Sequence, residues 1–248
     1  AKLKTSIWQL FVNDISMTSA RWPNGNWNDG SVWDKEQSMS WPEKNKGSYG
    51  HHFNKELAAI NADLTGAIII VNSGSFKTFK SNVIEHVPGT DNFKYDTKRK
   101  HIKVHFSFKG KTHRHGYFLE GKLALLDEEN EWFYNPKSKE IYLWAPDGKH
   151  PKNFKIKGKT QSYAFDIANS SYLKLEGLNF FGTTFKADDS HHITVEDCNF
   201  MYPSYSKRML GDLTLTDVSS MQARKKQTKT YNTIRNCKFE YMDGPVLD

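Results

Sequence analysis

Cysteine is scarce in this chain, since only Cys198 and Cys237 occur among 248 residues. A disulfide-stapled scaffold needs more cysteines, so the fold must depend on a hydrophobic core. Both cysteines fall at apolar positions of a repeat described below, which favours two buried thiols over a structural disulfide. They indicate nothing about a redox compartment.

Long apolar runs are absent too, because no stretch approaches the ~18 residues of a membrane-spanning helix. We therefore expect no membrane partner. The sequence shows no signal-peptide pattern, so we expect a mature or trimmed chain. It has no lysine-rich tail and no nucleic-acid-binding signature, which argues against nucleic acid. With 35 Lys and Arg against 28 Asp and Glu, the net charge of +7 favours an acidic partner, of which nucleic acid, anionic lipid and an acidic polymer are the three kinds.

A repeat of about 20 residues runs through the last third of the chain. Residues 173–180 (LKLEGLNF) recur as 193–200 (ITVEDCNF) and as 232–239 (NTIRNCKF). The same offset maps Phe165 onto Phe185. Short alternating strands at this period, with no space for a helix, are typical of a solenoid. We predict a right-handed parallel β-helix over residues 159–248, with three short strands per turn.

The inward residues of this repeat fill its core. Phe165, Leu173 and the other inward positions stack on their equivalents, with the phenylalanines at 180, 200 and 239 in one column. Gly177, Asp197 and Asn236 occupy a one-residue corner, because these types tolerate left-handed backbone angles. Residues 246–248 read as the first strand of a further turn. We therefore expect the natural protein to continue, and open helix ends to invite association.

Residues 1–158 predict an antiparallel β-rich, sandwich-like domain. Apolar or alternating segments bounded by turn residues predict its strands at 7–12, 68–71, 78–85, 93–96, 101–108, 132–134 and 141–144. Asn13-Asp14 is a hairpin turn, and Asn54 is suited to cap a short helix. The fold class is thus all-β throughout.

Several segments resemble recurring parts of bacterial β-helix carbohydrate-active enzymes. These are 9–13 (QLFVN), 17–24 (MTSARWPN), 131–135 (EWFYN) and 143–148 (LWAPDG). The resemblance is to the pectate-lyase-like superfamily, nearest to glycosidases with a β-rich insert, of the β-xylosidase and α-fucosidase types. It implies a secreted or periplasmic enzyme of polysaccharide degradation. It also implies that the acidic catalytic pair lies in later turns, so no catalytic residue is transferred from it.

Outward residues on the first strand of each turn are the catalytic candidates. Asp166 and Lys186 are neighbours there, and Asp248 begins the corresponding strand two turns on. Two acids and a base on one face could serve a glycosidase or a polysaccharide lyase. The alternative is a solvated ladder of surface charges.

Substrate-binding candidates come from two loops. The Trp-rich loop at 23–52 holds Trp27 and Trp33, whose faces could stack on sugars or plug the loop onto a sheet. The insertion at 203–229 contains Arg208, Arg224 and Lys225, which would suit a carboxylated or sulfated glycan if the insertion overhangs the first-strand face. A mobile basic loop is the alternative.

The DDSHH run at residues 188–192 brings together residue types that bind metals. Adjacent histidines on an extended chain point apart, so zinc is not expected, and calcium through Asp188 and Asp189 is the better variant. No other cofactor is expected. The sequence predicts a glycoside hydrolase acting on an acidic or sulfated polysaccharide. A polysaccharide lyase and a non-catalytic glycan-binding or adhesin β-helix are the alternatives.

Overall fold

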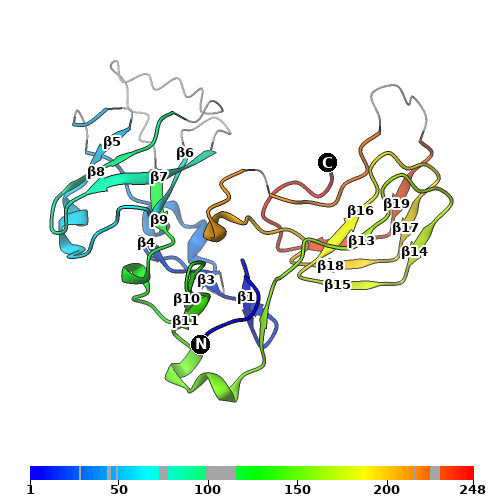
Figure 1. Ribbon diagram of the computed structural model, residues 1–248, viewed down its shortest axis with the longest axis horizontal. Helices are drawn as coiled ribbons and strands as arrows, with labels where there is room; N and C mark the ends of the chain where they lie inside the picture. Colours follow the sequence, from blue (N-terminus) through cyan, green and yellow to red (C-terminus); the bar gives the residue numbers. More distant parts are fainter. Residues whose placement is uncertain are drawn as a thin grey trace. The chain divides into compact units, whose positions relative to one another are not determined.

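The computed structural model describes residues 1–27, 29–43, 46–48, 50–72, 78–98, 116–214, 216–223 and 230–248. Arg224, Lys225 and the strand expected at 101–108 lie outside these ranges. The chain is all-β with very little helix, and it divides into two compact units (Figure 1). Unit 1 is Ala1–Lys4 with Leu10–Lys157, and unit 2 is Thr5–Gln9 with Gly158–Asp248.

Unit 1 is built on a six-stranded antiparallel sheet (Figure 1). In spatial order its strands are β4 (Arg21–Trp22), β9 (Gly116–Glu120), β6 (Ile68–Asn72), β7 (Thr78–His86), β8 (Asn92–Tyr95) and β5 (His51–Phe53). The strand β6 is buried along most of its length, as its apolar run predicts, while β7 and β8 alternate buried and more exposed side chains. The buried face forms a core around Ile69, Phe93 and Tyr117.

Shorter pairings complete unit 1. The turn at Asn13 and Asp14, both with positive φ, joins two short paired strands, and the predicted second hairpin is also present. These strands are β1 (Leu10–Val12), β2 (Ile15–Ser16), β10 (Glu131–Asn135) and β11 (Glu140–Leu143), with β3 (Thr18–Ser19) parallel to β10. The strand β12 (Ile156–Gly158) spans the boundary between the units.

The helices are short. The Asn54 side chain accepts a hydrogen bond from Glu56 N, so its predicted capping role is confirmed. The helices are η1 (Ser31–Trp33), α1 (Lys35–Ser38), η2 (Lys55–Ala59), η3 (Leu123–Leu125), η4 (Pro146–Gly148), η5 (Pro151–Asn153) and η6 (Arg208–Leu210). Within the described ranges, none has the length and apolar character that crossing a membrane requires.

Unit 2 consists of parallel sheets in which successive repeats contribute neighbouring strands (Figure 1). The first sheet pairs β13 (Tyr163–Asp166) with β16 (Thr184–Lys186); the second is β14 (Lys174–Glu176), β17 (Thr194–Glu196) and β19 (Thr233–Arg235); the third is β15 (Asn179–Phe181), β18 (Asn199–Met201) and β20 (Lys238–Glu240). Leu175 pairs with Val195, which confirms the register predicted from the 20-residue offset.

The predicted column of phenylalanines is confirmed. The Phe180 and Phe200 ring centroids are 4.3 Å apart, and those of Phe200 and Phe239 are 4.5 Å apart, with nearly parallel planes. Cys198 and Cys237 are free thiols, the first fully buried and the second packed against the same core. The expected corner residues at 177, 197 and 236 all have positive φ.

Residues 218–221 run in the first sheet, although the sequence places them in the insertion between repeats. Ser220 bridges to Lys186 in a parallel arrangement. Ser219 in turn bridges to Leu247, so the last residues of the chain occupy the next strand position. This corrects the expectation that the whole insertion overhangs the sheet.

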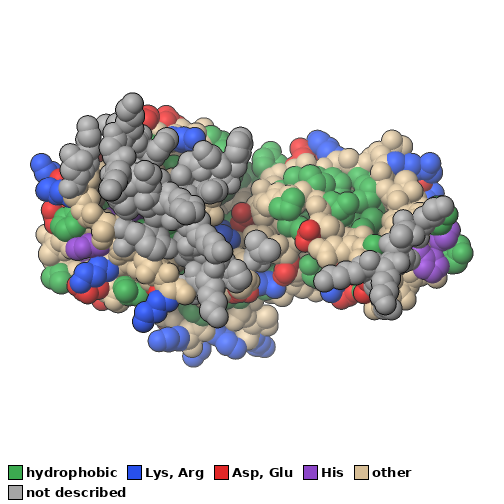
Figure 2. Space-filling model, turned by 90° about the horizontal axis from the view of Figure 1, so that it is seen from above, with side chains coloured by type: hydrophobic (Ala, Val, Ile, Leu, Met, Phe, Trp, Pro, Cys, Tyr) green, Lys and Arg blue, Asp and Glu red, His purple; other side chains and the backbone are tan. Residues whose placement is uncertain are grey.

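The first and last repeats leave apolar side chains uncovered. Phe165 and Leu173 were expected to point inward, but both are exposed, and among the described residues no strand pairs with β13 or β14 on the side away from β16 and β17. At the other end Phe239 is partly exposed and Leu247 is exposed. Figure 2 shows hydrophobic side chains gathered on the surface of unit 2. Association through these ends stays a prediction.

Candidate functional site

The outward side chains of the first sheet of unit 2 form the candidate site. Its register places Asp166 opposite Lys186, Lys186 opposite Ser220, and Ser220 opposite Asp248. The three catalytic candidates from the sequence therefore share one row across the sheet, as expected from the repeat. Their catalytic role stays a prediction.

Asp188 brings a further carboxylate to this row. Its side chain accepts hydrogen bonds from the Ser220 hydroxyl and, at 3.1 Å, from Gln222 N. Asp248 lies at the strand position beyond Ser220, one strand spacing of about 4.8 Å away. Asp166 is three spacings, or roughly 14 Å, from Asp248, which is beyond the ~5–9.5 Å of a glycosidase pair. The geometry therefore favours Asp188 as the partner of Asp248.

Tyr163 lies within the electrostatic field of these acids. Burial raises the pKa of its phenol, and the carboxylates of Asp217, Asp188, Asp166 and Asp248 raise it further, to about 12. The phenol therefore stays protonated at neutral pH and can donate a hydrogen bond on this acidic face. Two of these carboxylates lie beside ammonium groups, Asp217 beside Lys207 and Asp188 beside Lys186, so the face carries charges of both signs.

The basic side chains beside this face are engaged in ion pairs. Lys207 Nζ lies 2.5 Å from Asp217 Oδ2, which also accepts a hydrogen bond from Ser162 Oγ at 2.7 Å. Burial raises the pKa of Asp217, but the bonds from Lys207 and Ser162 outweigh burial and hold it below its usual range. Arg208 Nη1 lies 3.1 Å from Asp243 Oδ2, and little of the Arg208 side chain is exposed. Its predicted contact with an anionic glycan stays a prediction.

Lys159 is a buried amine in the same unit. Its Nζ donates to the carbonyl oxygens of Pro203 at 2.9 Å and Tyr202 at 3.3 Å. Burial lowers the pKa of Lys159 to about 7; the Lys207 charge also lowers it, and the Asp217 charge opposes the shift. Because only 4% of the residue is exposed, it cannot reach a polymer, and its role is to hold the chain after β18.

The tryptophans predicted to bind substrate are in unit 1. The Trp27 and Trp33 ring centroids are 5.4 Å apart in an edge-to-face contact, and both side chains are exposed. The backbone beside them is fixed, because Trp27 N donates to Thr18 Oγ1 and Asn26 N donates to Ser31 Oγ. Their exposure disfavours the alternative that both rings plug the loop onto a sheet.

The DDSHH run does not gather metal ligands. The Nδ1 atoms of His191 and His192 lie 3.0 Å apart, and the His192 ring is stacked between Tyr172 and Tyr231. In the part of the chain that the structure describes, no three His, Cys, Asp or Glu side chains converge on a metal position. The calcium interpretation through Asp188 and Asp189 therefore gains no support.

Sequence reasoning did not connect three residues of this face. From the sequence, Asp188 is a candidate only for calcium binding, and neither Asp217 nor Tyr163 is assigned a role. The useful signal was Val218, an apolar residue just after Asp217 that marks the start of a strand hidden in the insertion.

Comparison with models of protein families finds no match, and comparison with curated proteins finds none either. A solved structure described as a glycoside hydrolase is similar to this chain, with a TM-score of 0.51 and 12% sequence identity. The match covers 81% of this chain and 32% of the hydrolase, so the chain spans about a third of that protein's length. At this identity the similarity shows a shared fold, one found in a carbohydrate-active enzyme.

Proposed function

We propose that this protein is a glycoside hydrolase whose reaction takes place on the outward face of the first sheet of unit 2. The observation that carries the proposal is the hydrogen bond of Asp188 to the Ser220 hydroxyl, with Asp248 at the next strand position of the same row. Two carboxylates brought to one glycosidic bond can act on it, one as general acid and the other as base or nucleophile. The phenol of Tyr163 supplies a neutral donor to a sugar hydroxyl.

In this proposal, unit 2 is a segment of a right-handed parallel β-helix of the pectate-lyase-like type, and unit 1 is a sandwich-like domain. In-register parallel pairing supports it, as do positive φ angles at equivalent corners of successive repeats. Positive φ angles also recur at two other corners of the repeat. One comprises Tyr172, His192 and Tyr231, and the other comprises Gly182, Tyr202 and Tyr241. A fold shared with a glycoside hydrolase is consistent with it.

The proposed substrate is an acidic or sulfated polysaccharide, and the proposed enzyme is secreted or periplasmic. The net charge of +7 supports an anionic polymer, whereas the carboxylates around Tyr163 favour an uncharged sugar at the cleavage point. A polymer would satisfy both requirements if its charged groups are on sugars other than the two joined by the scissile bond.

A polysaccharide lyase is the second candidate, favoured by Lys186. This amine lies in the row between Asp166 and Ser220, and 3.9 Å from an Asp188 carboxylate oxygen. A lyase needs a base and a charge neutraliser, which Lys186 could provide. It would release unsaturated products, whereas hydrolysis would not.

The test is an assay of reducing ends and of unsaturated-product absorbance on a panel of neutral, carboxylated and sulfated polysaccharides. We expect Asp188→Asn and Asp248→Asn each to reduce hydrolysis by ~100-fold or more, since each removes an acid–base group. Asp189→Asn, on the same bend but outside the row, is the matched control and should retain activity. Glycan binding without any product would instead identify a binding module.

A further inference from the structure

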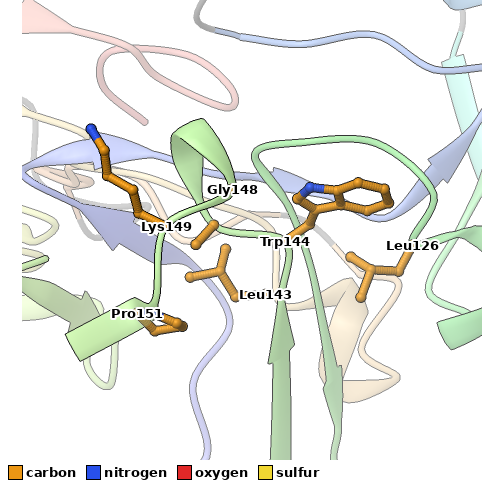
Figure 3. Close-up of a pocket in the computed structure, with 7 residues that line it drawn as sticks. Leu126, Leu143, Trp144, Gly148, Lys149 and Pro151 are labelled. Carbon is orange, nitrogen blue, oxygen red and sulfur yellow. The ribbon is translucent and has the colours of Figure 1, made fainter. Parts of the chain in front are cut away.

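A concave pocket in unit 1 is not explained by the acidic face. It has a volume of about 330 Å³ and lies where β11 leads into η4. In Figure 3 the Trp144 indole and Leu126 lie toward one end, Pro151 toward the other, and Leu143 between them. The lining is thus mainly apolar with one large aromatic face, and the pocket is an open depression of the surface against which a small ring could lie.

The backbone around Trp144 is held rigidly. Trp144 N donates to Glu131 O at 3.0 Å, and its carbonyl accepts from Asn130 N at the same distance. On the other side of the pocket, Gly148 N donates to Glu129 Oε1 at 3.1 Å. The indole, nearly half of which is exposed, is therefore presented by a fixed scaffold.

The charge at the pocket is compensated. Among the described residues that line it, Lys149 carries the charge, and its ammonium is paired with the Asp147 carboxylate at 2.7 Å. In Figure 3 the Lys149 side chain extends away from the Trp144 ring. The Lys149–Asp147 ion pair therefore leaves no unpaired charge among the described residues at the Trp144 ring, and an uncharged ligand suits this lining best.

We propose that this pocket is a glycan-binding subsite of unit 1, which holds one neutral sugar ring against the Trp144 indole. A pyranose ring has an apolar C–H face that packs on an indole, and hydroxyl groups at its edge that hydrogen-bond to a polar rim. Leu143 and Pro151 complete the apolar wall. The inference rests on the proposed function for the class of ligand, but not on the acidic residues of unit 2.

The exposed Trp27–Trp33 pair supports an extended glycan over a compact small molecule. Asn26 Nδ2 donates to Glu129 O at 3.5 Å, and Glu129 also holds the turn at Gly148. The loop with the tryptophan pair and the rim of the pocket are therefore fastened to one residue.

The experiment is calorimetric titration of three neutral hexasaccharides (cellohexaose, xylohexaose and mannohexaose) into the full chain and its variants. Trp144→Ala should weaken binding of the best hexasaccharide roughly three- to tenfold, the value of one aromatic contact. Trp144→Phe should recover part of the loss. Tyr142→Ala removes an exposed aromatic side chain from the same hairpin outside the pocket and should leave affinity unchanged.

The melting temperature of each variant shows whether it is still folded, so a loss of affinity through unfolding can be told from the loss of a sugar contact. The subsite is refuted if none of the three hexasaccharides binds. It is also refuted if Trp144→Ala and Tyr142→Ala reduce affinity equally. If hydrolysis depends on Asp188 but Trp144→Ala does not change affinity, the subsite is refuted and the proposed function stands. Binding that depends on Trp144 without any hydrolysis would support the subsite against the proposed function.

Discussion

Phe200→Ala tests the stacking of repeats in unit 2. The Phe200 ring is almost fully buried and lies between Phe180 at 4.3 Å and Phe239 at 4.5 Å. Truncating a buried Phe lowers the free energy of unfolding by ~3–5 kcal/mol, and the two stacked contacts place this site in the upper half of that range. Hydrogen exchange in graded urea, read by mass spectrometry, would report the two units separately.

Phe165→Ala is the matched control, because Phe165 belongs to the same unit but is 39% exposed and contacts the Phe180 ring edge-on at 5.9 Å. Its expected loss is roughly 1–2 kcal/mol, since less apolar area returns to water. The exchange midpoint of the β18 amides should therefore fall much more in Phe200→Ala. Similar small losses in both variants would refute the stacking argument.

Two buried ionisable groups should give opposite pH dependences. Burial lowers the pKa of Lys159 from 10.5 to about 7. Between these pH values the unfolded chain binds more protons than the native state, so the free energy of unfolding rises with pH. Lys159→Met should abolish this rise, and a rise that persists in the variant would exclude Lys159 as its source. Burial raises the pKa of Glu131 from 4.5 to about 8, so the native state binds more protons and stability falls as pH rises between those values. Urea unfolding across pH should show a flatter profile for Glu131→Gln, and an unchanged slope would contradict the assignment.

The repeat was readable from sequence because local rules determine it. Leu175, Val195 and Ile234 recur at inward positions, and corner residues with left-handed angles separate the strands. Where one face of a strand must be buried, a one-residue slip would expose every apolar side chain. Register therefore followed from the pattern alone.

Long-range placement was not readable in the same way. Ser219 and Ser220 lack the apolar alternation of a strand, and their bridges to Leu247 and Lys186 join segments that lie far apart in the chain. Residues Thr5–Gln9 belong to unit 2, joined by Lys159 N donating to Gln9 O, although they are more than 140 residues from it in the chain. The approach of Asp188 to Ser220 depends on the same hidden strand, so the candidate acid pair could not be identified from the repeat.

A crystal structure of the Asp248→Asn variant with a bound oligosaccharide cleaved by the wild type tests the central claim most directly. The proposal predicts a glycan across β13, β16 and residues 218–221, with its scissile oxygen between Asp188 and position 248 and within hydrogen-bond reach of one of them. A glycan found only in unit 1, or lying over β14 and β17 instead, would contradict the assignment of this face as the catalytic site.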